Sequence, residues 1–173
     1  MDNLRFKNIF RIPTARLPNW DYSSTGWYFV TICVKNRECC LGNITDRKMR
    51  FSSIGKIAQK YWLEIPNHYQ NVTLDEYNIL PNHIHGIIII HSSVETGHAP
   101  SLRKKNHSIG NIIGSFKSAS SNKIHKFKPN FFWQPRFYDH IIKNEQSLNK
   151  IRSYIRFNPL NWDTDEENPQ TPK

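Results

Sequence analysis

The sequence lacks the features that would mark an exported or membrane-bound protein. It has only three cysteines, Cys33, Cys39 and Cys40, an odd set with an adjacent pair that fits neither a disulfide framework nor a Cys-x-x-Cys metal site. Its longest apolar run, residues 87–90, is far too short to span a bilayer. No charged-then-apolar signal opens the chain. We therefore expect a cytoplasmic protein with reduced thiols and no membrane partner.

Acidic residues are also scarce. The 173 residues include 14 Asp and Glu against 24 Lys and Arg, a formal charge of +10. This balance favours a polyanionic partner, most commonly nucleic acid, although contact with a ribosome or a membrane surface would produce the same number. With 38% hydrophobic and 13% aromatic residues, the chain has the composition of one folded domain.

The hydrophobic patterning predicts strands alternating with helices. β-branched and aromatic runs predict strands over 27–35, 72–80 and 84–90, and another after Pro135 within 132–142. Apolar residues at helical spacing predict helices over 52–65, 109–127 and 145–157. The order β-α-β-β-α-β-α fits an α+β fold, in which a single antiparallel sheet has helices packed on a face.

The chain divides into three parts. Residues 1–26 are expected to form an extended basic arm, 27–162 the domain, and 163–173 an acidic, proline-containing tail that is disordered. Pro81 and Asn82 form a turn dipeptide between two predicted strands, which indicates a hairpin.

Two histidines stand at the start of the most aliphatic strand. Alternate side chains of a strand share a face, so His83 and His85 point the same way, about 6–7 Å apart along the backbone, and could reach one metal ion. Gly86 would permit a close approach to the backbone there. The alternative is that one histidine caps the hairpin while the other packs on the sheet.

Two imidazoles make an incomplete ligand set. Tyr154 and Asn158 lie four residues apart at the end of the last predicted helix and share a face. Asn158 could supply a carbonyl oxygen to the metal, and Tyr154 could present its phenol beside it. Alternatively, Tyr154 is a half-buried helix residue and Asn158 caps the helix, which must end there because Pro159 follows.

Basic residues surround these motifs and are candidates for DNA contacts, although a charge run can equally be a solvated face. The candidates are Arg16 in the arm, Arg103, Lys104 and Lys105 in the polar linker 92–108, and Lys117, Lys123, Lys126 and Lys128 on the second helix and its exit. Phe131, Phe132 and Trp133 follow directly; they could stack on unpaired bases or belong to the core.

Three motifs in this order carry a resemblance to a known family. They are LPNHIHGIIII, the segment WQ…FYDHII, and YIRFNP, and LPNWDYSSTGWYFVTICVKNREC near the start adds to them. Together they resemble the REP-associated tyrosine transposases, a branch of the single-tyrosine HUH transposases, over about residues 16–162. The resemblance implies a ferredoxin-like HUH nuclease fold and a DNA-handling enzyme of the bacterial cytoplasm, associated with the nucleoid.

The resemblance also implies a mechanism. His83, His85 and Asn158 would hold a divalent metal, Mg²⁺ or Mn²⁺, and Tyr154 would attack a phosphodiester of single-stranded or hairpin DNA to form a 5′-phosphotyrosine. Related transposases have glutamine where this chain has the shorter Asn158. Tyr138 is the rival nucleophile. A monomer is expected, and the competing functions are a non-catalytic DNA-binding regulator and a hydrolase that uses metal-activated water.

Overall fold

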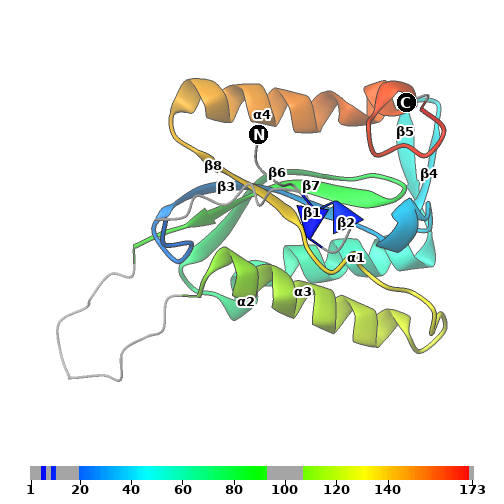
Figure 1. Cartoon of the computed structure of the whole chain (residues 1–173), viewed down its shortest axis with the longest axis horizontal. Coiled ribbons are helices and arrows are strands. Elements are labelled where there is room, and N and C mark those ends of the chain that lie inside the picture. The colour runs from blue at the N-terminus through cyan, green and yellow to red at the C-terminus, as the bar shows by residue number, and fades with distance from the viewer. Residues whose placement is uncertain (1–4, 7–8, 11–19, 93–106, 172–173) are drawn as a thin grey trace.

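A four-stranded antiparallel sheet forms the centre of the molecule (Figure 1). The computed structural model describes residues 5–6, 9–10, 20–92 and 107–171. The strand order is β6-β7-β3-β8, with bounds β3 (Gly26–Cys33), β6 (Val72–Ile79), β7 (His83–Ile90) and β8 (Tyr138–Ile142). The predicted α+β class, the hairpin at Pro81 and the order of the main elements are confirmed.

Helices cover both faces of this sheet, whereas the sequence predicted them on one (Figure 1). On one face lie α1 (Ser53–Leu63) and α3 (Ile109–Ile124), and on the other lies α4 (Glu145–Phe157). Each begins at a polar cap whose side chain accepts a backbone N–H of the first turn: Ser52, Ser108 and Asn144. The short α2 (Ile65–His68) follows α1.

The strand β7 contributes a different kind of side chain to each face. Ile84, Ile88 and Ile90 point into the larger apolar core, where α1 and α3 pack. His83 and His85 lie on the α4 face, together with Ile87 of a much smaller apolar cluster. The period of two that defines a strand therefore separates a structural face from a polar one.

Several elements were not anticipated from the sequence. β4 (Gly42–Thr45) and β5 (Lys48–Phe51) form a hairpin, preceded by the 3₁₀ turn η1 (Lys35–Arg37). Within the predicted arm, β1 (Arg5–Phe6) pairs with β2 (Ile9–Phe10). The rest of the arm up to residue 19, and residues 93–106 of the predicted linker, lie outside the described part.

The segment after α4 differs from the disordered tail that the sequence predicted. Asn158–Thr164 form the 3₁₀ helix η2, and residues 165–171 continue in turns. Arg37 donates to the carbonyl of Glu166 at 2.9 Å and pairs with the carboxylate of Glu167 at 3.0 Å. Asn82 donates to the carbonyl of Glu167 at 2.7 Å. These polar anchors come from distant parts of the chain and leave no periodic pattern in the tail itself.

A search of the described residues for membrane spans finds no helix with the length and apolarity needed to cross a bilayer.

Candidate active site

The two histidines of β7 form the centre of the site. Their side chains are buried, and their Nε2 atoms lie 3.0 Å apart. On the far side of each ring, His83 Nδ1 lies 2.8 Å from Asn82 Oδ1, and His85 Nδ1 lies 2.9 Å from Thr31 Oγ1. Both rings are therefore fixed through Nδ1, and both direct Nε2 to one point.

The hydrogen bonds of Asn82 determine the tautomer of His83. The Asn82 amide nitrogen donates to two backbone carbonyls, those of Arg37 and Glu167, so the oxygen is the atom that faces His83. An amide oxygen only accepts, and His83 Nδ1 must therefore carry the proton. His83 Nε2 is left with a lone pair, as a metal ligand requires. The Thr31 hydroxyl can donate or accept, so it permits the same tautomer in His85.

Burial keeps both imidazoles uncharged. It lowers the pKa of His83 to about 3, with a further contribution from the positive charge of Arg37. The pKa of His85 also falls to about 3, because of burial and then of the neighbouring His83. At neutral pH the pair is a ready donor set for a cation.

An edge strand holds α4 over this pair. A register shift in β6 between Leu74 and Tyr77 leaves Asp75 and Glu76, two successive acidic residues, both facing α4. Arg152 donates to both oxygens of Asp75, at 2.9 and 2.5 Å, and Arg156, one turn further on, donates to Glu76 at 2.7 Å.

The same strand fixes the last turn of α4. Asn78 of β6 donates to the carbonyl of Ile155 at 3.2 Å, and Ile155 itself is fully buried in the small apolar cluster. The residue before it, Tyr154, is thereby directed at the histidines.

Tyr154 reaches the histidine pair. Its Oη lies 3.2 Å from His85 Nε2, and half of its side chain remains exposed. Burial of the other half raises the pKa of Tyr154 to about 12, and the negative charges of Asp165 and Glu166 add to the rise. The phenol is thus protonated at neutral pH, and its deprotonation requires positive charge nearby.

Asn158 also lies at the site, with an acidic neighbour that the sequence did not identify. Its side chain is buried, its Nδ2 donates to Asp165 Oδ2 at 3.0 Å, and its Oδ1 has no hydrogen-bond partner within the described part of the chain. Ligand atoms of His83, His85 and Asp165 all lie within 4.8 Å of one another. Two neutral imidazoles with a carboxylate are a donor set that suits a divalent metal. Asp165 escaped detection because it lies in the predicted tail.

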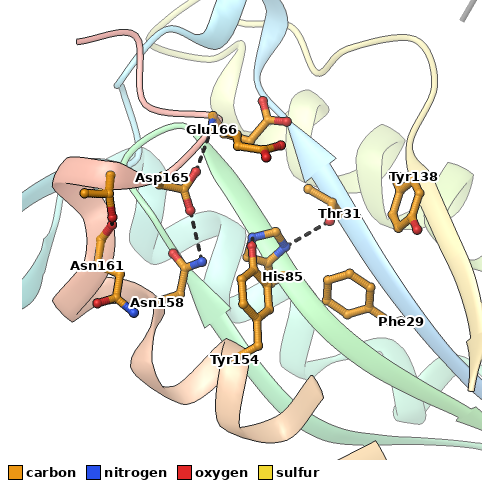
Figure 2. Close-up of a pocket in the computed structure, with 11 residues that line it drawn as sticks. Phe29, Thr31, His85, Tyr138, Tyr154, Asn158, Asn161, Asp165 and Glu166 are labelled. Atoms are coloured by element: carbon orange, nitrogen blue, oxygen red, sulfur yellow. Dashed lines mark hydrogen bonds between the residues drawn. The ribbon is translucent and has the colours of Figure 1, made fainter. Parts of the chain in front are cut away.

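A cavity of about 530 Å³ opens onto these groups (Figure 2). Asp165, Glu166 and Glu167 of the tail line it, as do Phe29 and Tyr138. Both candidate nucleophiles therefore border the same cavity. Of the two, Tyr154 contacts His85 through its oxygen, whereas the ring of Tyr138 makes a T-shaped contact with Phe29, with ring centroids 6.2 Å apart.

The structure does not bring the predicted lysines to this site. They belong to α3 and its exit, on the opposite face of the sheet (Figure 1). Lys117 donates to the carbonyls of Gln134 and Arg136, and burial lowers its pKa to about 8. Lys128 pairs with Glu38, whereas Lys123 and Lys126 are exposed.

The structure describes some of the other residues predicted to contact DNA, but not all of them. Arg16, Arg103, Lys104 and Lys105 lie outside the described residues. Of the three aromatic residues after α3, Phe131 and Trp133 are core residues, and Phe132 is half exposed. A side chain at Gly86 would point away from the site, towards Trp62 of α1.

Sequence comparison gives the class to which this architecture belongs. The family model for IS200-like transposases matches residues 23–158, which include both histidines, Tyr154 and Asn158. The chain belongs to this family.

Two individual relatives are similar to most of the chain. The chain is 37% identical over 163 residues to an uncharacterised protein of Haemophilus influenzae strain Rd, covering 88% of this chain and 91% of the relative. It is 26% identical over 140 residues to a protein of the same strain provisionally named a REP-associated tyrosine transposase, covering 81% and 73%.

A solved structure has the same fold. It is that of a REP-associated tyrosine transposase bound to a REP hairpin, and it superimposes with a TM-score of 0.60 at 18% identity, over 85% of this chain and 74% of that one.

Proposed function

We propose that this protein is a metal-dependent single-stranded DNA endonuclease and strand transferase that acts through a 5′-phosphotyrosine on Tyr154. The observation that carries the proposal is the position of Tyr154, whose Oη lies 3.2 Å from His85 Nε2 and whose side chain lines the cavity. A nucleophile and a cation site share one substrate position there, as phosphodiester cleavage requires.

Different residues of the chain have different roles in the proposed reaction. His83 and His85 would hold the metal through Nε2, and Asp165 or Asn158 would add an oxygen. Thr31 and Asn82 orient the two rings. A bound metal would neutralise the negative charge of the scissile phosphate. Its positive charge would also favour deprotonation of Tyr154, whose pKa is raised. Either Mg²⁺ or Mn²⁺ is compatible with the proposal, and imidazole ligands favour Mn²⁺ over Mg²⁺.

The covalent step conserves the energy of the phosphodiester. The Tyr154 phenol loses its proton as Oη bonds to phosphorus. The 3′ oxygen leaves with the electron pair of the broken P–O bond and takes up a proton, becoming a 3′-hydroxyl. An incoming 3′-hydroxyl can reverse the step and rejoin DNA without ATP.

The test is a denaturing gel of labelled single-stranded hairpin oligonucleotides incubated with the protein and Mn²⁺ or Mg²⁺. The expected result is a protein–DNA band that retains a 3′ label but not a 5′ label and disappears with EDTA, in Tyr154→Phe and in His83→Ala. Tyr138→Phe is the matched control, because Tyr138 borders the same cavity, and it should still form the band. Loss of the band in Tyr138→Phe alone would make Tyr138 the nucleophile.

The same oligonucleotides, run on the denaturing gel and in a native binding assay, separate the competing functions. Cleavage without a covalent band would indicate a hydrolase that activates water. Salt-sensitive binding without cleavage would indicate a DNA-binding regulator that keeps the transposase fold. A preference for REP-type hairpins is part of the proposal by analogy with the related structure, whose protein binds a REP hairpin.

We propose further that the protein acts as a monomer, because one chain supplies both histidines and the tyrosine that contacts them. Mixing His83→Ala with Tyr154→Phe tests this. If each site is built within one chain, the mixture stays inactive. Restored adduct formation would instead require two chains that exchange tyrosines.

A further inference from the structure

The cavity beside Tyr154 has two unlike walls. On one side lie the carboxylates of Asp165 and Glu166, and on the other the rings of Phe29 and Tyr138 (Figure 2). Glu167, the next residue along the chain, also lines the cavity. A phosphate seated at the histidines carries a nucleotide on each side of it. The acidic wall repels the neighbouring phosphates, so the strand passes more easily over the aromatic wall.

Phe29 forms the base of the aromatic wall. It is buried and stacks on His85, with ring centroids 5.4 Å apart and planes inclined by 29°. Tyr154 and Tyr138 each make a T-shaped ring contact with it, both with a centroid distance of 6.2 Å. The ring of Phe29 therefore contacts both the proposed nucleophile, Tyr154, and Tyr138.

Tyr138 is the exposed member of this group. It lies on β8, an edge strand of the sheet, opposite Thr31 in register, and its side chain is 49% exposed. Within the described part of the chain, its hydroxyl has no hydrogen-bond partner. An aromatic ring held from behind, with an open side and no bonded hydroxyl, has the form of a stacking platform.

We propose that Tyr138 stacks on an unpaired nucleobase next to the scissile phosphate and so positions the single strand for attack. The proposal rests on the function proposed above and names a specificity-determining residue for it. It assigns the two tyrosines of the cavity different work: Tyr154 reacts through its oxygen, and Tyr138 binds through its ring. Because every base has a π-face, the subsite selects unpaired over paired DNA rather than one base over another.

Binding of two labelled probes tests the proposal: single-stranded dT12 and a 12-mer with the same phosphates but abasic sugars. Fluorescence anisotropy is measured in Mn²⁺ in a Tyr154→Phe background, where no adduct can form. Adding Tyr138→Ala should weaken dT12 binding about tenfold, the loss of one stacked base. Adding Tyr138→Phe should leave it unchanged, and the abasic probe should bind all three proteins equally.

Phe127→Ala is the matched control. Phe127 is a similarly exposed aromatic, at 51%, but its N–H donates to the carbonyl of Ile124 at the end of α3. The helix α3 covers the opposite face of the sheet (Figure 1). If Phe127→Ala weakened binding of dT12 but not of the abasic probe, and Tyr138→Ala weakened neither, the strand would pass over α3 and the proposal would be overturned. Equal weakening on both probes, or a Tyr138→Phe protein as weak as Tyr138→Ala, would overturn it too. None of these outcomes depends on cleavage, so failure of the proposed endonuclease activity would be seen separately.

Discussion

The two faces of the central sheet are built on different principles, although the same strands supply both. On the α1 and α3 face, β7 contributes isoleucines to a large continuous core. On the α4 face it contributes two histidines, and the cluster beside them comprises five buried apolar residues within the described part of the chain. Stability and chemistry are thus separated by the alternation of a strand, so a side chain on one face can be changed with little effect on the task of the other.

The largest effect is expected from the core face. Ile88 is fully buried in the large cluster, and Ile88→Ala should lower the free energy of unfolding by about 2–5 kcal/mol. Urea denaturation measures the loss. Ile88→Val, as a control, should cost about 0.5–1.5 kcal/mol. The affinity for Mn²⁺, measured by titration calorimetry under native conditions, should not change in either variant; a parallel loss would mean that the faces are coupled.

Gly86 tests how tightly α1 packs on the sheet. A Cβ at this position would lie 2.3 Å from Trp62 Cζ2, and Trp62 is fully buried against Tyr77 and Phe116. Gly86→Ala should therefore destabilise the protein by about 1–3 kcal/mol through overpacking, seen as a lower melting temperature.

Gly114 provides the opposite case for comparison. It lies in α3, and an added Cβ would meet nothing within 4 Å. Gly114→Ala should stabilise the protein by about 0.5–1 kcal/mol. If both glycine variants melt alike, packing at Gly86 is looser than the structure indicates.

Thr31 tests the polar face. If His85 binds a cation through Nε2, its Nδ1–H must donate to the Thr31 hydroxyl, 2.9 Å away. Thr31→Val removes that acceptor at nearly constant volume and should weaken Mn²⁺ binding about 10- to 100-fold. Thr31→Ser keeps the hydroxyl and should bind nearly as well. Unchanged affinity in Thr31→Val would argue against His85 as a ligand in this tautomer.

The site residues that belong to a regular pattern could be predicted from the sequence. His83 and His85 stand out because histidines interrupt an aliphatic strand, and Tyr154 and Asn158 because a helix brings residues four apart together. Their convergence is visible only in the fold, where Tyr154 Oη comes 3.2 Å from His85.

The residues that escaped prediction have no such pattern. Asp165 lies in an acidic segment that was predicted to be a disordered tail. Contacts with distant residues hold this segment at the site, among them those of Arg37 and Asn82 with the neighbouring backbone. Thr31 is one β-branched residue among several in its strand. The placement of helices on two faces was also missed, because an amphipathic pattern identifies the buried side of a helix but not the side of the sheet that it covers.

The smallest effect is expected where α4 is tied to β6, since surface ion pairs rather than a deep core hold it there. The hydrogen bond from Arg152 lowers the pKa of Asp75, so this pair stabilises the fold above the unfolded pKa of about 3.9 and loses its effect as pH falls through the lower native pKa. Arg152→Met should cost about 0.2–1 kcal/mol at pH 7, and less at high salt.

The difference between wild type and Arg152→Met in urea denaturation should shrink below about pH 4, as Asp75 becomes protonated. Asp75→Asn is the matched control, because the asparagine cannot titrate and its protein should show the same dependence as Arg152→Met. A difference that persists in acid would mean that Arg152 acts through a contact that does not titrate, such as the hydrogen bond from its Nη1 to Asn149 Oδ1 at 3.1 Å. The link between α4 and β6 would then depend on neutral contacts, as the packing of the other face does, and the two faces would differ in their chemistry alone.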